Sequence, residues 1–149
     1  WQDEEKTREA IDEEGWMHTG DLATLDAEGY CNIVGRVKDM VIRGGENVYP
    51  REVEEFLYRH PKVKEVQVFG VPDDKLGEAL AAWIVLVPGQ SATEEEIKAY
   101  CKGQIAHYKI PLYIRFKDSL PMTVTGKPQK FIMRDAMIAE LGLKVAKTA

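Results

Sequence analysis

The chain has 149 residues, an apolar fraction of 44% and a charged fraction of 30%, which is the composition of an ordinary globular domain. This length suits one domain, or one domain with a tail, and can bury a core without disulfides or metals. The net charge of -5, from 20 basic and 25 acidic residues, argues against broad binding to nucleic acid or to anionic membranes. No apolar run reaches the roughly 20 residues that a membrane span requires, and the acidic start resembles no signal peptide.

Cysteine and histidine usage gives no metal-binding pattern. Cys31 and Cys101 form no Cys-x-x-Cys, and His18, His60 and His107 lie far apart, so a structural zinc site is not expected. We expect two reduced, half-buried thiols in a reducing compartment, and hence a cytoplasmic protein. Because the sequence does not begin with methionine, we also expect it to be part of a longer chain.

The first expected elements are short. Residues 4–11 contain helix formers without a breaker, so they predict a helix. Residues 21–25 and 30–34 flank a turn-rich tetrapeptide and predict a hairpin. The apolar run 39–42 is broken by Gly44 and Gly45.

The second half predicts a sheet with helices packed on it. Pro50 suits the first position of a helix that Pro61 ends, and the β-branched run 63–71 and the apolar run 80–87 predict strands, the second central. Thr93 and Glu96 form a capping box, residues 112–116 predict a third core strand, and Gly142 caps a last helix that follows residue 131. The order predicts an α+β fold with a small mixed sheet, preceded by a β-hairpin. We expect residues 144–149 to fray.

Three segments stand out as candidates for chemistry. Neither serine lies in a Gly-x-Ser-x-Gly elbow, and Gly126-Lys127 lacks the upstream glycine of a phosphate-binding P-loop. The three segments are residues 18–21 (HTGD), 35–54 (GRVKDMVIRGGENVYPREVE) and 120–127 (LPMTVTGK).

These segments, in this order and spacing, resemble the motifs of the adenylate-forming superfamily, which includes AMP-forming acyl-CoA synthetases, peptide-synthetase adenylation domains and firefly luciferase. The resemblance covers nearly the whole chain. The tracts 44–47 and 69–73 are most similar to the acyl-CoA synthetase branch, particularly medium- and long-chain fatty acid and aryl acid ligases. The resemblance implies that residues 1–35 are the end of a large N-terminal domain with a linker hairpin, and that residues 36–149 are a mobile C-terminal domain.

The resemblance also implies a two-step reaction. A carboxylate attacks the α-phosphate of ATP and forms acyl-AMP, and the thiol of CoA then displaces AMP after the small domain rotates. ATP with Mg²⁺, held mainly by the large domain, and CoA are the implied cofactors and co-substrates. The implied partners are that large N-terminal domain, a carboxylic acid substrate and CoA. We expect no nucleic acid partner and no transmembrane segment. We expect the isolated chain to be inactive.

Four residues receive roles in adenylation from this resemblance. Asp21 would hold the ribose hydroxyls, because a carboxylate accepts two hydrogen bonds from a diol; alternatively it forms a turn after Gly20. Arg36 would contact the ribose or phosphates of ATP, or is a solvated arginine at a strand end. Lys38 would be the hinge, or an ordinary exposed lysine. Lys127 would be the catalytic lysine, or a loop lysine.

Four further residues receive roles in binding CoA. Gly44 and Gly45 would border the pantetheine tunnel, because glycine lets a backbone approach a ligand closely, and a simple hairpin turn explains them equally well. Glu46 would contact CoA through its backbone. Tyr108 lies near where some CoA ligases place an aromatic ring against the CoA adenine, and a half-buried tyrosine before a strand is an equally good interpretation.

Two other functions remain open. The chain could belong to an adenylation domain that loads a carrier protein, which the acceptor thiol would distinguish, or it could be a stand-alone interaction module. We also expect Asp21 to be poorly anchored without the large domain. The loop at residues 123–127 should be mobile, because it offers few buried contacts.

Overall fold

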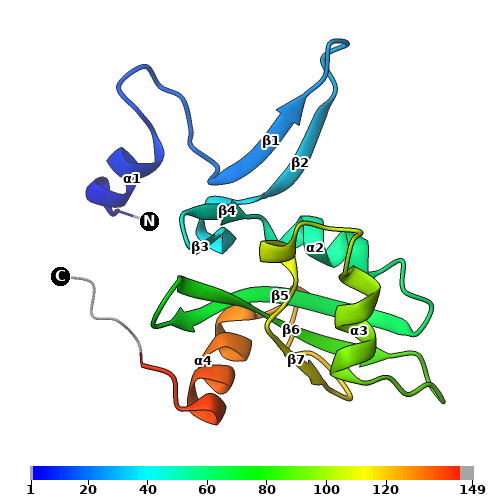
Figure 1. Cartoon of the computed structure of the whole chain (residues 1–149). Helices are drawn as coiled ribbons and strands as arrows, with labels where there is room; N and C mark the ends of the chain where they lie inside the picture. The colour runs from blue at the N-terminus through cyan, green and yellow to red at the C-terminus, as the bar shows by residue number, and fades with distance from the viewer. Residues whose placement is uncertain (1, 145–149) are drawn as a thin grey trace. The chain divides into compact units, whose positions relative to one another are not determined.

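The computed structural model describes residues 2–144 and divides into two compact units, Trp1–Lys38 and Asp39–Ala149 (Figure 1). The tail that the sequence predicts to fray lies outside the described residues apart from Lys144. The assignment of residues 1–35 to the end of a larger domain stays a prediction.

The first unit is a helix followed by a hairpin. Asp3 caps the helix by accepting a hydrogen bond from the Lys6 backbone N–H at 3.1 Å. Among residues 2–38 no side chain is buried, so this unit has no core of its own. The elements are α1 (Glu4–Ala10) and the antiparallel pair β1 (Asp21–Leu25) and β2 (Cys31–Arg36), followed by the short 3₁₀ helix η1 (Val37–Asp39) that ends across the unit boundary.

The second unit is built on a five-stranded sheet in the order β4-β3-β6-β5, with β7 pairing to β6. β6 pairs antiparallel with β5 along its length, meets β3 at its first residue and runs parallel to β7. The prediction that the second apolar strand is central is therefore confirmed. The strands are β3 (Val41–Arg43), β4 (Glu46–Val48), β5 (Val63–Asp73), β6 (Gly77–Leu86) and β7 (Tyr113–Phe116).

Helices cover both faces of this sheet (Figure 1). Alternate residues of β6 belong to two separate cores. Ile84 faces the core of α2 (Pro50–Leu57) and α3 (Glu94–Cys101), whereas Trp83 faces the core of α4 (Lys130–Leu141). The buried positions of α4 are Met133 and Met137, at helical spacing. The predicted α+β class is confirmed.

The helix ends follow local chemistry, with one correction. Thr93 caps α3 by accepting from the Glu96 N–H at 3.2 Å, and Gly142 ends α4 with a positive φ of 63°; both caps confirm predictions. The prediction that α2 runs to Pro61 is wrong, because the helix ends at Leu57. The Tyr58 N–H still bonds to the Glu54 carbonyl four residues back, but the N–H groups of Arg59 and His60 bond to carbonyls three residues back, which tightens the chain into turns.

Neither thiol is half-buried as predicted. Cys31 is exposed on β2, and Cys101 at the end of α3 is fully buried against the first core. Both are free thiols. Burial raises the pKa of Cys101 to about 11, because an apolar environment disfavours the thiolate.

Candidate functional site

Lys127 lies at the end of a small closed loop that leads into α4. The backbone N–H of Thr123 donates to the Lys127 carbonyl at 2.8 Å, and the Lys127 N–H donates to Thr123 Oγ1 at 2.9 Å. A further bridge pairs Met122 with Pro128, and the Gln129 N–H donates to the Pro121 carbonyl at 2.9 Å.

The sequence did not predict this ladder. Lys127 itself is exposed, and among residues 2–144 its ammonium group forms no ion pair. Residues 124–127 are all exposed and Thr123 is half-buried, so the expectation that this loop offers few buried contacts is confirmed, while its mobility stays a prediction. We call residues 121–129 the lysine hairpin.

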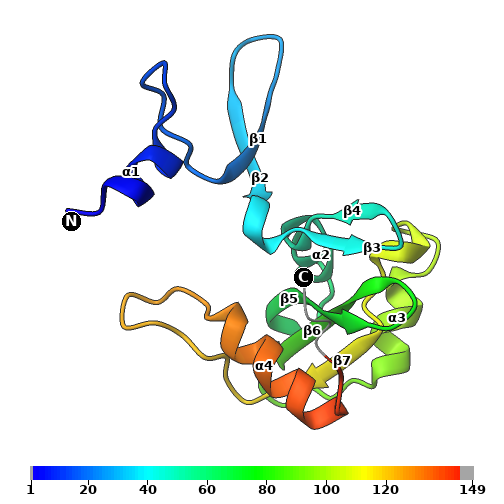
Figure 2. The same cartoon turned by 90° about the vertical axis from the view of Figure 1, so that its left-hand side faces the viewer.

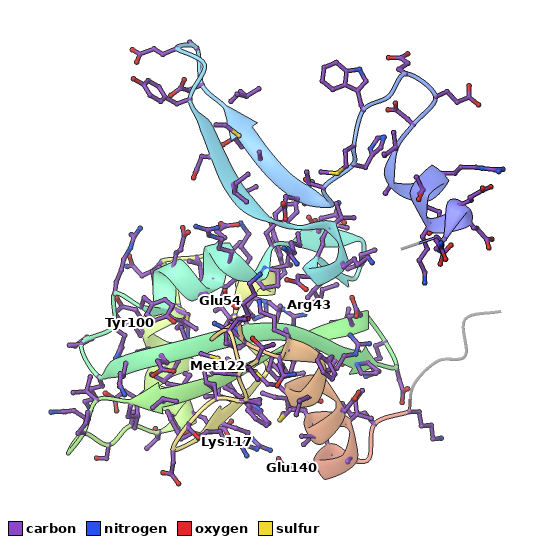
Figure 3. All side chains as sticks on the ribbon, turned by 180° about the vertical axis from the view of Figure 1, so that it is seen from behind. Arg43, Glu54, Tyr100, Lys117, Met122 and Glu140 are labelled. Atoms are coloured by element: carbon purple, nitrogen blue, oxygen red, sulfur yellow. The ribbon has the colours of Figure 1, made fainter. Side chains whose placement is uncertain are left out.

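The base of the lysine hairpin is tied to α2 by a partly buried ion pair. Lys130, the first residue of α4, places Nζ 2.7 Å from Glu54 Oε1, and the same oxygen accepts the Val68 N–H at 2.8 Å. Glu54 is 8% exposed and points from α2 toward the sheet (Figure 3). Because β5 is the last strand in the sheet order, its outward-facing Val68 N–H would otherwise lack a partner. Glu54 therefore provides an acceptor for the edge strand β5 and, through Lys130, also fixes the start of α4.

Gly44 and Gly45 form the two-residue turn between β3 and β4. Their φ angles are 59° and 88°, which are the positive values that a tight hairpin turn of this kind requires. The Gly44 N–H donates to the Leu76 carbonyl at 2.8 Å, so the turn rests on the β5–β6 connection. The hairpin-turn interpretation of the glycines is confirmed, and their contact with CoA stays a prediction, as does that of Glu46.

The β5–β6 connection that supports this turn is itself organised by a carboxylate. Asp73 Oδ1 accepts the backbone N–H groups of Lys75 and Leu76 at 3.0 and 2.9 Å. These hydrogen bonds lower the pKa of Asp73, first through Leu76 and then through Lys75, with a smaller contribution from the positive charge of Arg43. The ionised carboxylate thus holds the turn on which Gly44 rests.

Tyr108 is brought to the same region by Arg43. Arg43 ends β3, and its Nη1 donates to the Tyr108 carbonyl at 2.6 Å. Tyr108 belongs to the 3₁₀ helix η2 (His107–Lys109), is half-buried and packs against the first core. Lys109 adds a second link through a 2.5 Å contact with Glu52 of α2. Residues that lie 65 and 57 positions apart in the sequence are therefore neighbours.

The predicted residues of the second unit fall into two groups on opposite sides. Figure 2 shows the lysine hairpin projecting from one side, before α4, and the β3–β4 turn beside η2 on the other. Lys127 belongs to the first group, whereas Gly44, Gly45, Glu46 and Tyr108 belong to the second. This arrangement separates the residue proposed for adenylation from those proposed for CoA.

Asp21 and Arg36 meet within the first unit. They are partners in the β1–β2 register, and Arg36 Nε donates to Asp21 Oδ1 at 3.1 Å. Strand pairing and this ion pair give Asp21 partners within the hairpin, while the expectation that it is poorly anchored stays a prediction. Lys38 is exposed in η1, and the compact-unit boundary falls after it. The hinge role of Lys38 stays a prediction, as do the nucleotide contacts of Asp21 and Arg36.

Sequence reasoning missed the residues that position these groups, namely Arg43, Glu54 and Lys130. Glu54 gave a signal, since it lies three residues before the buried Leu57 and so shares the inward face of α2. An acid on that face implies a buried partner. Arg43 and Lys130 gave no such signal. Within the described part of the chain, no three His, Cys, Asp or Glu residues cluster to hold a metal ion, so no Mg²⁺ ligands are assigned.

Comparison with known proteins shows the family. The model of the AMP-binding enzyme C-terminal domain matches residues 52–127, just over half of the chain. The chain is 57% identical over 143 residues to a putative acyl-CoA synthetase, YngI, of Bacillus subtilis (strain 168), covering 96% of this chain and 26% of that protein. It is also 57% identical to the mitochondrial medium-chain acyl-CoA ligase ACSF2 of Danio rerio, covering 96% of this chain and 24% of the relative.

Solved structures agree. The structure of this chain is similar to that of ATP-bound MatB from Rhodopseudomonas palustris, with a TM-score of 0.87 and 39% sequence identity. The match covers 91% of this chain and 27% of the MatB chain. The chain spans about a quarter of the length of the curated relatives it matches. No helix in residues 2–144 is both long and apolar enough to cross a membrane. The chain belongs to the family of AMP-binding enzyme C-terminal domains.

Proposed function

We propose that this chain is the C-terminal domain of an ATP-dependent carboxylic acid–CoA ligase that acts on fatty acids. The curated relatives named as acyl-CoA synthetase and medium-chain acyl-CoA ligase support this substrate class. The observation that carries the proposal is the placement of Lys127 and of the Gly44–Gly45 turn on opposite sides of one compact unit (Figure 2). Two separate faces suit a domain that serves two successive half-reactions.

In the first half-reaction a carboxylate oxygen attacks the α-phosphorus of ATP, the bond to the β-phosphate oxygen breaks, and pyrophosphate leaves. Negative charge is shared between the α-phosphate and the attacking carboxylate, and the Lys127 ammonium group stabilises both. The structure suits this role because the side chain is exposed and free of ion pairs among residues 2–144, while its backbone is held by the hairpin. The Asp21 carboxylate and the Arg36 guanidinium bind the ribose and phosphates, which requires their mutual ion pair to open.

In the second half-reaction the CoA sulfur attacks the acyl carbonyl carbon, the bond to the AMP oxygen breaks, and AMP leaves. The chain presents its other face by rotating about Lys38, so that the Gly44–Gly45 turn and Glu46 border the pantetheine arm and Tyr108 contacts the adenine. Glycine at the turn leaves the backbone open to a close approach. Mg²⁺ would accompany ATP and would be held mainly by the large N-terminal domain. A cytoplasmic location stays a prediction.

The test uses the complete polypeptide that contains this chain and measures the two half-reactions separately. Acyl-AMP formation is followed as pyrophosphate release from acid and ATP, and transfer is followed from preformed acyl-AMP and CoA. Lys127→Ala should lower adenylation on the order of 10²–10³-fold and leave transfer within a few-fold of wild type. Lys64→Ala, which removes an exposed lysine of β5, is the matched control and should change neither.

Two outcomes would contradict this proposal. An equal loss in both half-reactions would place Lys127 in a shared site or in the fold, and no loss in either would remove it from the reaction. The acceptor separates the two enzyme interpretations, because a domain that loads a carrier protein would transfer to a holo-carrier thiol in preference to CoA. A polypeptide that makes no acyl-AMP would leave only the interaction-module interpretation.

A further inference from the structure

The structure assigns to Arg43 a positioning role in the second half-reaction: its guanidinium group fixes Tyr108 beside the Gly44–Gly45 turn. This inference rests on the proposed function and concerns a residue of the 35–54 segment that received no role from the sequence. Tyr108 and the turn are distant in sequence, and each would contact a different end of the same CoA molecule. Something in the fold must therefore set the distance between them.

Arg43 is placed to do so because it is anchored by backbone and side chain in different elements. Its backbone pairs with Glu46 across the glycine turn and with Gly77 of β6. Its side chain is part-buried and crosses to the Tyr108 carbonyl at 2.6 Å. Within residues 2–144 the Arg43 side chain donates to this carbonyl alone. Its Nε is buried and has no hydrogen-bond partner among these residues.

The segment that carries Tyr108 needs such an anchor. η2 has only three residues, and its regular backbone hydrogen bonds are those from Lys109 to Ala106 and from Ile110 to His107. A single 3₁₀ turn holds its own geometry poorly. The second link joins Lys109, which is 20% exposed, to the Glu52 carboxylate, which is 51% exposed, and solvent at the carboxylate weakens this ion pair. The hydrogen bond from Arg43 acts on the Tyr108 backbone itself, whereas this ion pair acts through the side chain of the next residue.

The glycine turn does not depend on Arg43 in the same way. Its position is fixed by the Gly44 N–H bond to the Leu76 carbonyl and by the β3–β4 ladder. Loss of the Arg43 side chain should therefore shift the Tyr108 backbone, which keeps only its packing on the first core and the Lys109 link, and leave the turn in place. Binding of the adenine end of CoA would weaken, while the pantetheine end would be received as before.

The experiment compares wild type, Arg43→Met and Tyr108→Ala in the complete polypeptide, with CoA and with pantetheine as acceptors for preformed acyl-AMP. Methionine keeps the apolar stem and removes every donor. Arg43→Met should raise the KM for CoA by about tenfold or more and leave the KM for pantetheine within about twofold of wild type. Tyr108→Ala should have the same two effects. The double variant should resemble either single variant, because both remove one contact.

Two controls separate positioning from folding. Arg51→Met removes an arginine of α2 that pairs only with Glu55 among the described residues, and it should leave both KM values unchanged. Adenylation provides the second control, because Lys127 lies in the same compact unit. Pyrophosphate release by Arg43→Met should stay within about twofold of wild type. Arg43→Lys should be only partly effective, since an ammonium group lacks the guanidinium fork.

The inference is overturned if Arg43→Met leaves the KM for CoA unchanged, or if it raises the KM values for CoA and pantetheine equally. Loss of adenylation in the same variant would also overturn it and would assign Arg43 to the stability of the fold. Failure of the proposed function is recognisable without any variant, because wild type would then form no acyl-CoA from acyl-AMP and CoA, and both proposals would fall together.

Discussion

Removing the Glu54 carboxylate should destabilise this chain more than any exposed charge substitution on the same helix. Glu54→Ala leaves the Val68 N–H without an acceptor, and an unsatisfied buried donor costs about 1–3 kcal/mol. It also leaves Lys130 without its partner, and breaking a buried ion pair costs about 3–5 kcal/mol. The Lys130 side chain is 22% exposed and can turn toward water, which reduces the second cost. We expect a loss of about 3 kcal/mol in the free energy of unfolding.

The measurement is urea unfolding of the 149-residue chain, followed by far-UV circular dichroism. The neighbouring residue provides the control, because Glu55 makes an exposed ion pair with Arg51 at 2.9 Å. Glu55→Ala should change the free energy of unfolding by less than about 0.5 kcal/mol. Equal effects of the two alanine substitutions would refute the assignment of Glu54 as a structural anchor.

A double-mutant cycle tests whether the two charges act as a pair. Lys130→Met should cost less than Glu54→Ala, because Glu54 would still accept the Val68 N–H. The double variant Glu54→Gln/Lys130→Met leaves no uncompensated charge and keeps an acceptor for that N–H. Its cost should therefore fall below the sum of its two single variants by about 1 kcal/mol or more. Additive effects would show that Lys130 and Glu54 do not stabilise one another.

Two further results are expected from the core of the second unit. Gly70→Ala should lower the free energy of unfolding by about 1–3 kcal/mol, because a new Cβ would lie 3.0 Å from both Val41 Cγ2 and Glu78 Oε1. Gly35→Ala, where nothing lies within 4 Å, should be near neutral in the same urea titration. A thiol reagent at pH 8 should modify exposed Cys31 at once and Cys101 only in denaturant, because burial raises the pKa of Cys101 to about 11; rapid native modification of two thiols per chain would contradict its burial.

Local pattern predicted the helices, the long strands and the caps, because each depends on a few neighbouring residues. Thr93 needs only a following helix to act as a cap. The apolar run of β6 needs only a sheet that buries it on both faces to form a strand. The end of α2 was misplaced because Pro61 sets a limit on a helix without requiring that it be reached. β4 was not predicted, since three residues give no periodicity and the strand exists by pairing with β3 across the glycine turn.

The candidate site was predicted as residues and not as an arrangement. Asp21 and Arg36 were named separately, yet their ion pair follows from the hairpin register. The division of the remaining residues between two sides of one unit depends on the path of the chain through the sheet, which no local spacing encodes. The ladder that closes the lysine hairpin was missed because it uses a threonine hydroxyl and backbone groups.

The long second segment, residues 35–54, therefore carries two kinds of information. Gly44 and Gly45 are exposed and available to a ligand, but Arg43, Glu52 and Glu54 bind partners within the fold. Arg43 and Glu52 reach the residues around Tyr108, whereas Glu54 reaches the base of the lysine hairpin. One continuous stretch of sequence thus supports both faces. Substitutions in this stretch should divide by the face that each side chain supports, and not by their proximity to the glycine turn.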